Sequence, residues 1–327
     1  MRATDMGTPM RDTADKVDLS ACRLCVIRNR GSGKQDAEAQ AKTIREALQG
    51  RVAEFALRET SRGDQLQDLA RQAVRDGFDV VVAAGGDGTQ SAIAGALAGT
   101  DTLMGVLPGG TFNYFARDLG VGETIEDALE TLLDARPRAV DVGQIDGLVF
   151  LNNVSLGAYP HILKTREGIY KRWGRSRLAA YWSVMVALRR LRHPMRLTAT
   201  VEGEEQRYTT ALVFVARSAY QLDSFGLDGA DAIRAGNLAV LIAKARKPLP
   251  LMRSAVRLAL GFSAKDSDFD LIVTESLQIE TDKAQQLIAH DGEKTRMKSP
   301  FHVQVMHGAL KVLVPADGSN KTQDAGA

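Results

Sequence analysis

The chain of 327 residues is 44% apolar and 25% charged, and its net charge at pH 7 is +2. A chain of this length and composition can bury a sizeable core and is expected to form two globular domains. The small net charge argues against a nucleic acid as a general partner. No segment approaches the roughly 18 consecutive apolar residues of a membrane-spanning helix.

The two ends and the two cysteines indicate no special chemistry. Residues 1–20 mix acidic and basic side chains and contain no apolar run, so we expect a disordered tail, no signal peptide and a cytoplasmic protein. Residues 317–327 predict a second disordered tail. Cys22 and Cys25 have the spacing of a redox or metal half-site, but they fall in a strand-like segment, where residues three apart point to opposite faces. With no second pair to complete a zinc site, we expect two structural thiols.

Strand-like and helix-like segments alternate over residues 21–142. Strands are expected around 24–27, 53–57, 78–84 and 103–107, and helical spacing of apolar residues appears between them, at 37–48, 66–74 and 93–97. This alternation predicts a Rossmann-like, mostly parallel α/β domain. Such sheets bind ligands at the carboxyl ends of their strands.

After Pro137 the pattern changes to strand-like stretches separated by polar turns such as Glu202-Gly203-Glu204. The stretches lie near 148–156, 196–202, 207–216, 237–243, 269–282 and 301–314. They predict a second, largely antiparallel β-sandwich domain over 143–308. Helical insertions are expected at about 176–191 and 251–260.

The segment Gly85-Gly86-Asp87-Gly88-Thr89 joins a buried strand to the start of a helix. Glycines allow close approach of a ligand to the backbone, and the free amides at a helix amino end favour phosphate. The spacing is not that of the dinucleotide-binding GxGxxG motif, so a nicotinamide dehydrogenase fits poorly. The alternative interpretation is a tight strand-to-helix turn.

Three further loops follow strands of the same domain. Residues 107–113 read Leu-Pro-Gly-Gly-Thr-Phe-Asn and again open a helix, which makes a second phosphate-type loop. The first strand is followed by Asn29-Arg30-Gly31-Ser32-Gly33-Lys34 and the second by Thr60-Ser61-Arg62-Gly63-Asp64. Taken alone, either of the last two is equally well an ordinary polar loop.

These motifs occur in the order found in diacylglycerol kinases, sphingosine kinases and their bacterial relatives, which the chain resembles over about residues 22–316. The resemblance rests on GGDGT at 85–89, a PxGTxN-like loop at 108–113, an NPxSGK-like loop at 29–34 and Asp-Gly-Glu at 291–293. It implies an ATP-binding α/β domain, a β-rich lipid-substrate domain and a reaction in the cleft between them. It also implies that the last strand, within 309–316, returns to complete the first domain.

The resemblance further implies roles for individual residues. Asp291 is the candidate general base, and Asp87 is the second candidate catalytic residue. Residues that match ATP-site positions are Asn29, Ser32, Gly33, Thr60, Gly85, Gly86, Asp87, Gly88, Thr89, Gly110, Thr111, Asn113 and Glu293. Mg²⁺ is the expected second cofactor, with its protein ligands unassigned. Spacing alone favours the interpretation of Asp291 as an Asp-Gly hairpin turn residue that carries little packing, and the resemblance reverses this preference.

The chain departs from the family pattern at several positions. After GGDGT the family usually has Leu-Asn-Glu, where this chain has Gln90, Ser91 and Ala92. Tyr114 replaces the usual Asp after the PxGTxN loop, and Arg30 replaces a Pro in the first loop. The family's Asp-Asp-Gly, which helps to hold a structural Mg²⁺, corresponds here to the unrelated stretch 233–237. These departures place the accessory metal site in doubt.

The segment 161–196 contains ten Lys or Arg residues and one acidic residue, Glu167, with Trp173, Tyr181 and Trp182 interspersed. Basic residues with interfacial aromatics suit an anionic membrane surface. The alternative is a solvated helix face with its aromatics in the core. The membrane interpretation predicts peripheral membrane association.

The sequence therefore predicts an ATP- and Mg²⁺-dependent lipid kinase that phosphorylates diacylglycerol or a related lipid alcohol. An NAD kinase also carries GGDGT, but the PxGTxN-like loop and the basic aromatic segment argue against that activity. A catalytically weak nucleotide- or lipid-binding protein of the same fold is the alternative from another class. A homodimer is compatible with the sequence, which does not indicate the lipid head group.

Overall fold

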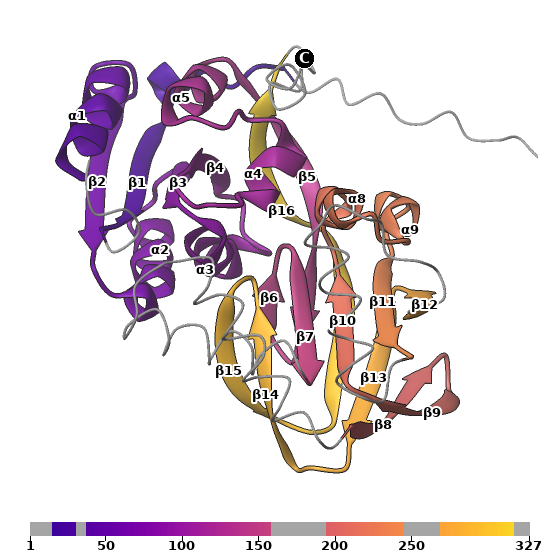
Figure 1. The fold of residues 1–327 in the computed structure, drawn as a ribbon. Helices are drawn as coiled ribbons and strands as arrows, with labels where there is room; N and C mark the ends of the chain where they lie inside the picture. The colour runs from indigo at the N-terminus through magenta and orange to yellow at the C-terminus, as the bar shows by residue number, and fades with distance from the viewer. Residues whose placement is uncertain (1–14, 31–36, 158–193, 245–268, 317–327) are drawn as a thin grey trace, which may run out of the picture.

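The computed structural model describes residues 15–30, 37–157, 194–244 and 269–316. Figure 1 shows an α/β half stacked on a half made largely of strands. The helical insertions expected at 176–191 and 251–260, and nearly all of the basic segment 161–196, lie outside the described residues. No helix in the part of the chain that the structure describes is long and apolar enough to cross a membrane.

The α/β half is built on four parallel strands in the order β2-β1-β3-β4. They are β1 (Arg23–Asn29), β2 (Glu54–Thr60), β3 (Val80–Gly85) and β4 (Leu103–Pro108). The strand β3 is buried along its whole length, because helices cover both faces of the sheet. The predicted parallel α/β arrangement is confirmed.

Each face of the parallel sheet has its own apolar core. On one face α1 (Ala37–Leu48) and α5 (Ile125–Leu133) contribute side chains such as Ile44 and Leu129. The other face is covered by α2 (Leu66–Arg75), α3 (Asp87–Leu97) and α4 (Tyr114–Leu119), which contribute Leu66, Ile93 and Phe115. Two of these helices, α3 and α4, begin in the loops that carry the glycine motifs.

Two long strands join the halves of the molecule. The strand β16 (Phe301–Pro315) pairs in parallel with β4 through Val312 and Met104 and antiparallel with β5 (Ala135–Ile145). The end of the chain thus does return to the α/β sheet. Because β5 runs through both halves, the boundary expected between residues 142 and 143 falls inside a strand.

Beyond β16 the same ten-stranded sheet continues into the sandwich and faces a second, six-stranded antiparallel sheet. The added strands of the first sheet are β6 (Leu148–Phe150), β13 (Ser276–Thr281), β8 (Met195–Val201) and β9 (Glu204–Thr210). The second sheet has the order β12 (Phe269–Thr274), β11 (Leu238–Ala243), β10 (Leu212–Ala216), β7 (Asn153–Gly157), β14 (Gln285–His290) and β15 (Glu293–Lys298). Side chains of both sheets, such as Phe301 and Val215, share one core. The predicted sandwich is confirmed, and the short helices α8 (Ala219–Phe225) and α9 (Ala230–Arg234) follow β10.

Two stretches expected as single strands, 207–216 and 269–282, each form two strands in different sheets. The hydroxyl of Thr210 accepts a hydrogen bond from the Leu212 backbone N–H, and Thr274 does the same for Ser276. These local bonds replace a strand-to-strand bond at the point where the chain crosses between the sheets. Threonine also has high strand propensity, so the break is hard to recognise from composition.

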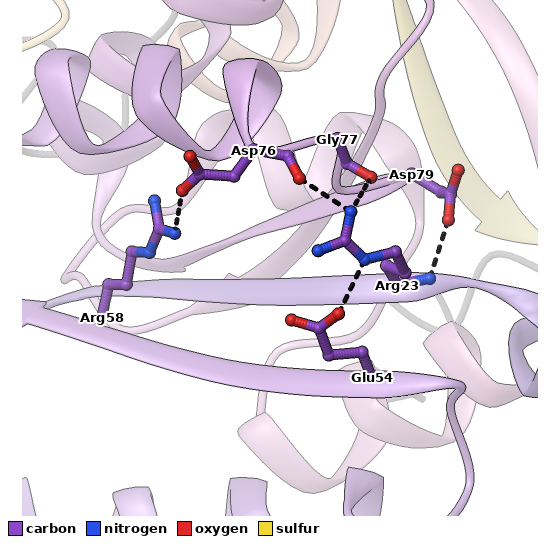
Figure 2. Close-up of polar contacts among 6 residues, drawn as sticks. All are labelled: Arg23, Glu54, Arg58, Asp76, Gly77 and Asp79. Carbon is purple, nitrogen blue, oxygen red and sulfur yellow. Dashed lines mark hydrogen bonds and ion pairs between the residues drawn. The ribbon is translucent and has the colours of Figure 1, made fainter.

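Arg23 connects three segments at the amino end of the parallel sheet (Figure 2). Its Nε donates to Glu54 on β2, and one guanidinium nitrogen donates to the carbonyl oxygens of Asp76 and Gly77 at distances of 2.7 and 3.0 Å. The backbone N–H of Arg23 donates to the Asp79 carboxylate, 2.7 Å away. The guanidinium therefore satisfies carbonyl groups left free where α2 ends.

Replacing Arg23 with Met is expected to lower the melting temperature by a few degrees, because the carbonyls of Asp76 and Gly77 lose their donor. Thermal unfolding followed by circular dichroism measures the effect. Lys42→Met removes only an exposed pair with Glu46 on α1 and should change the melting temperature little. Equal shifts in the two variants would mean that the carbonyl contacts contribute nothing.

The cysteines form no disulfide. Cys25 is buried on the sheet, and burial raises the pKa of its thiol to about 11. At neutral pH this thiol is protonated and a poor nucleophile.

Candidate functional site

A cleft of about 1110 Å³ lies at the carboxyl ends of β1 and β2, between the helices α2 and α3 and the β14–β15 hairpin. Six residues predicted for the ATP site line it: Asn29, Gly86, Asp87, Gly88, Thr89 and Glu293. Four others, Gly85, Gly110, Asn113 and Thr60, do not line it, and neither does Asp291, the residue predicted as the base. Thr111 is exposed on the neighbouring loop, and Ser32 and Gly33 lie outside the described residues.

The two glycine loops pack backbone against backbone. The Gly109 N–H donates to the Gly85 carbonyl over 3.1 Å. A Cβ atom on Gly110 would lie 2.7 Å from the Cα of Gly86, and one on Gly86 would lie 3.0 Å from the Cα of Gly110. Glycine is required here because of this close approach. This contact between the two loops brings the amino ends of α3 and α4 together.

Gly110→Ala is expected to push the two loops apart, since the new methyl group would meet backbone atoms that cannot rotate away. Because Asp87 is bound to the second loop, we expect the KM for ATP, the nucleotide that the sequence predicts, to rise about tenfold, which corresponds to about 1.4 kcal/mol. Steady-state kinetics measures this. Gly99→Ala has open space around the new Cβ but a positive φ of 79°, so it controls for a general loss of stability. A normal KM in Gly110→Ala would contradict the steric argument.

Asp87 is the first residue of α3 and is bound from both halves of the molecule. Its Oδ2 accepts from the backbone N–H of Asn113 at 3.0 Å, and its Oδ1 accepts from the side-chain amide of Asn152 at 3.3 Å. Asn113 has the left-handed φ of 50°, and its side chain both donates to and accepts from the backbone of Gly110. Asn113 thus fixes the second glycine loop against Asp87.

Asp291 forms a hairpin turn with Gly292 between β14 and β15, with positive φ values of 43° and 87°. The side chain is only 4% exposed, and its two oxygens accept the backbone N–H groups of Leu151, Asn152 and Asn153 at 2.7, 2.8 and 3.1 Å. The hairpin interpretation therefore describes the backbone correctly. The expectation that this residue carries little packing is wrong, because its carboxylate holds a buried segment 140 residues away in the sequence.

Asn152 connects the two acidic residues. Its backbone donates to Asp291, its side chain donates to Asp87, and its side-chain oxygen is buried without a hydrogen-bond partner among the described residues. Burial, and after it the negative charge of Asp291, raise the pKa of the Asp87 carboxyl above its ordinary value, while backbone N–H groups of residues 113–115 partly offset the rise. A cleft carboxylate with a raised pKa is a candidate proton acceptor.

Two other buried polar residues, which do not line the cleft, hold the loops beside it in place. The hydroxyl of Thr60, buried behind the cleft, donates to Gln65 and accepts from the backbone of Arg62, so it shapes the loop before α2. Gln90, one of the departures from the family pattern, is fully buried and donates to the Gly85 carbonyl at 2.9 Å. This residue keeps the turn between β3 and α3 closed.

Sequence reasoning missed Asn152, Asn153 and the structural role of Gln90. An Asn-Asn pair between two short apolar strands was the available signal, because neighbouring buried amides need hydrogen-bond partners. Asn153 donates from its side chain to Gln221 of α8 at 2.9 Å. Within the described ranges, no group of three His, Cys, Asp or Glu side chains could hold a metal ion by itself.

Two family models match the chain in succession. The diacylglycerol kinase catalytic domain matches residues 23–145, and the YegS C-terminal NAD kinase β-sandwich-like domain matches residues 165–314. The first range contains both glycine loops, and the second contains Asp291 and Glu293. The junction of the two matches lies close to the end of β5.

Several curated relatives match less than half of this chain. A protein of Chromohalobacter salexigens named "Probable lipid kinase YegS-like" is 39% identical over 142 residues, which are 41% of this chain and 45% of the relative. The diacylglycerol kinase of Bacillus subtilis is 32% identical over 133 residues, 40% of this chain and 44% of that enzyme. The aligned region thus spans less than half of the length of these relatives.

Solved structures resemble the whole fold. A diacylglycerol kinase from Bacillus anthracis gives a TM-score of 0.69 at 20% identity, covering 91% of this chain and 98% of that chain. Yeast NADH kinase, solved with NADH, gives 0.56 at 12% identity, with 98% and 91% covered. By these matches, residues 23–145 carry a diacylglycerol kinase catalytic domain and residues 165–314 a YegS-type C-terminal domain, on a fold shared with the solved structures.

Proposed function

We propose that the protein is an ATP-dependent lipid kinase that transfers the γ-phosphoryl group to the hydroxyl of diacylglycerol or a related lipid alcohol. The observation that carries the proposal is the position of Asp87, a carboxylate with a raised pKa that lines the cleft from a glycine loop packed against a second one. The names of the relatives support a lipid as the acceptor.

The cleft suits the phosphates of a nucleotide. Gly86, Asp87, Gly88 and Thr89 line it at the amino end of α3, where the backbone N–H groups of a helix and its dipole favour negative charge. A Cβ on Gly88 would lie 3.2 Å from Oε1 of Glu293, so glycine keeps this approach open. The Asn29 side of the cleft is left for the rest of the nucleotide.

Asp87 and Asp291 have different roles in this proposal. Asp87 accepts the proton of the acceptor hydroxyl as the new oxygen–phosphorus bond forms, and the bond between the γ-phosphorus and the bridging oxygen breaks to release ADP. Asp291 was the base in the hypothesis drawn from sequence. Its oxygens are occupied by three backbone N–H groups, and it does not line the cleft, so we assign it a positioning role.

Oxygen ligands for Mg²⁺ are available in the same cleft. Mg²⁺ prefers carboxylates and phosphate oxygens and commonly takes only one or two ligands from the protein. Glu293 supplies an exposed carboxylate beside Gly88 at the amino end of α3. Glu293 would therefore hold the ion together with the nucleotide phosphates, and the ion would neutralise phosphate charge.

Transfer of label from γ-labelled ATP tests the activity. The purified chain is incubated with a mixed lipid extract, with defined diacylglycerols and, separately, with NAD, and the labelled products are identified. We expect a labelled phospholipid and no labelled NADP. Labelled NADP would replace the lipid kinase with an NAD kinase, and no product in any arm would favour a binding protein of the same fold.

We also propose that the enzyme is cytoplasmic and binds an anionic membrane surface through the basic segment 161–196, which lies almost entirely outside the described residues. Neutralising Arg189, Arg190 and Arg192 should weaken vesicle binding about a hundredfold, since each of the three cations contributes on the order of 1 kcal/mol at such a surface and about 1.4 kcal/mol is tenfold. Sedimentation with vesicles containing phosphatidylserine measures this.

The same assay in rising salt should weaken binding by the wild type, because salt screens surface charge. A matched control neutralises three exposed basic side chains on and just after α1, namely Lys42, Arg45 and Arg51. This control should bind like the wild type. If both triple variants lose binding equally, net charge rather than the basic segment determines attachment.

A further inference from the structure

Four aromatic side chains meet beside the second glycine loop, where α4 contacts α8. The rings of Phe112 and Tyr114 stack at 5.4 Å with an interplanar angle of 4°. Tyr114 lies 6.5 Å from Tyr220 and 6.0 Å from Phe225 between ring centroids. We call these four residues the aromatic shelf.

Part of the shelf is open to solvent. Phe112 is 51% exposed and Phe225 is 37% exposed, although large apolar side chains are strongly favoured to leave water. Adjacent exposed aromatic residues of this kind mark binding surfaces more often than isolated ones do. Tyr114, which contacts the other three rings, occupies the position where the family pattern usually has Asp.

The first half of the shelf is attached directly to Asp87. Phe112 and Tyr114 flank Asn113, whose left-handed backbone places the two rings face to face. The N–H of Asn113 donates to the Asp87 carboxylate at 3.0 Å. The hydrogen bond from the Asn113 N–H to Asp87 therefore connects the loop that carries the stacked rings directly to the proposed reacting centre.

The second half is attached to the segment that carries Asn152. The Asn152 carbonyl accepts from the backbone N–H groups of Arg217 and Ser218, and the Ser218 hydroxyl caps α8 by accepting from the Gln221 N–H. Arg117 of α4 donates to the Tyr220 hydroxyl at 3.1 Å and pairs with Glu123. The aromatic shelf is thus held from both halves of the molecule.

The shelf and the nucleotide cleft lie on different sides of Asp87. The cleft is lined from α2, α3 and the β14–β15 hairpin, and none of the four aromatic residues lines it. Figure 1 shows α4 and α8 on the far side of α3 from α2. Phosphoryl transfer needs the attacking and leaving oxygens roughly in line on opposite sides of phosphorus. An acceptor hydroxyl should therefore approach from the side of the shelf.

We propose that the aromatic shelf binds the apolar chain of the acceptor and so selects a long-chain lipid alcohol over a short, water-soluble one. This inference rests on the proposed function and specifies its acceptor. The chain lies against Phe112 and Phe225 and covers their exposed faces, and the hydroxyl reaches Asp87.

The test compares acceptors that differ only in chain length. In a Phe112→Ser, Phe225→Ser double variant, the ratio of kcat/KM for a long-chain diacylglycerol to that for a short-chain one should fall at least tenfold. The double variant with Leu at both positions should retain most of the ratio, because Leu is also apolar. The matched control is Leu271→Ser with Val273→Ser, which removes two exposed apolar side chains of β12.

A second measurement does not depend on turnover. Binding of a fluorescent long-chain monoacylglycerol to the protein without ATP should weaken at least tenfold in the Phe→Ser double variant and should not change in the β12 control. If binding of the monoacylglycerol follows this pattern but the protein phosphorylates no lipid, the proposed role of the shelf stands and the proposed kinase activity is wrong. Turnover of lipid with an unchanged chain-length ratio and unchanged binding in the Phe→Ser variant would overturn the shelf alone.

Discussion

Asp87→Asn is expected to lower kcat for phosphoryl transfer by about 10² to 10⁴-fold, the usual contribution of a positioned general base. The amide keeps the size of the side chain and can still accept from the N–H of Asn113, so the glycine loops should stay together. Nucleotide affinity should change little. Single-turnover kinetics beside isothermal titration with ATP separates the two effects.

The same substitution should not destabilise the protein at neutral pH. Burial and the charge of Asp291 raise the pKa of Asp87 in the folded state, so its ionised form is disfavoured there relative to the unfolded chain. This cost is present above the folded pKa and disappears as the pH falls below the unfolded pKa of about 3.9. The melting temperature of Asp87→Asn should therefore equal or exceed that of the wild type at pH 8, and the difference should shrink toward pH 4.

Asp64→Asn provides the matched control for Asp87→Asn. Asp64 also lines the cleft, but it is exposed and paired with Arg62, which lowers the pKa of its carboxyl. This variant should keep kcat within about threefold of wild type, well short of the loss expected for a base. A similar kcat for the wild type and Asp87→Asn would remove Asp87 from the chemistry.

The α/β half could be predicted from sequence because its signals are local. A strand buried on both faces, such as β3, must be almost entirely apolar, and a loop whose backbone approaches another backbone must contain glycine. Gly86 and Gly110 were therefore recognisable before their contact was known. The periodicity of α1 and α2 and the glycines that follow them also marked the ends of these helices.

The sandwich was harder to predict because its pairings join distant segments. The strand β5 is paired along its length with β16, some 160 to 180 residues later, and its sequence carries two Arg and one Pro rather than an apolar alternation. The crossings at Thr210 and Thr274 depend on side-chain bonds to the backbone within strand-like sequence. Local composition contains no sign of either feature.

The sequence predicted the loops that form the site but not the hydrogen bonds that join Asp87, Asn152 and Asp291. The six predicted residues that line the cleft belong to motifs that spacing could identify, whereas Asn152 became visible only when the fold placed it between Asp87 and Asp291. A spacing argument also could not show that the Asp291 carboxylate is turned toward residues 151–153. The division of roles between the two acidic residues therefore needs a measurement.

Asp291→Asn is expected to lower both stability and kcat. An Asn amide would present its NH₂ group to the backbone donors of residues 151–153, and a buried N–H without an acceptor costs about 1 to 3 kcal/mol. The matched control is Asp146→Asn, because Asp146 also begins an Asp-Gly turn with a positive φ of 45°, between β5 and β6, and accepts from the exposed backbone of His302. Thermal melts should show a clear loss for Asp291→Asn and a small one for the control.

The pH dependence of kcat/KM then distinguishes a positioning residue from a base. The charge of Asp291 raises the pKa of Asp87, so removing that charge should lower the Asp87 pKa and move the acid limb of the profile to lower pH. If Asp291 is itself the base, the variant should lose about 10² to 10⁴ in kcat across the whole profile, with no shift in the acid limb. A reduced kcat with a displaced acid limb would assign proton transfer to Asp87 and leave Asp291 to hold residues 151–153 in place. An unchanged kcat together with an unchanged acid limb would exclude Asp291 both as the base and as the residue whose charge raises the pKa of Asp87.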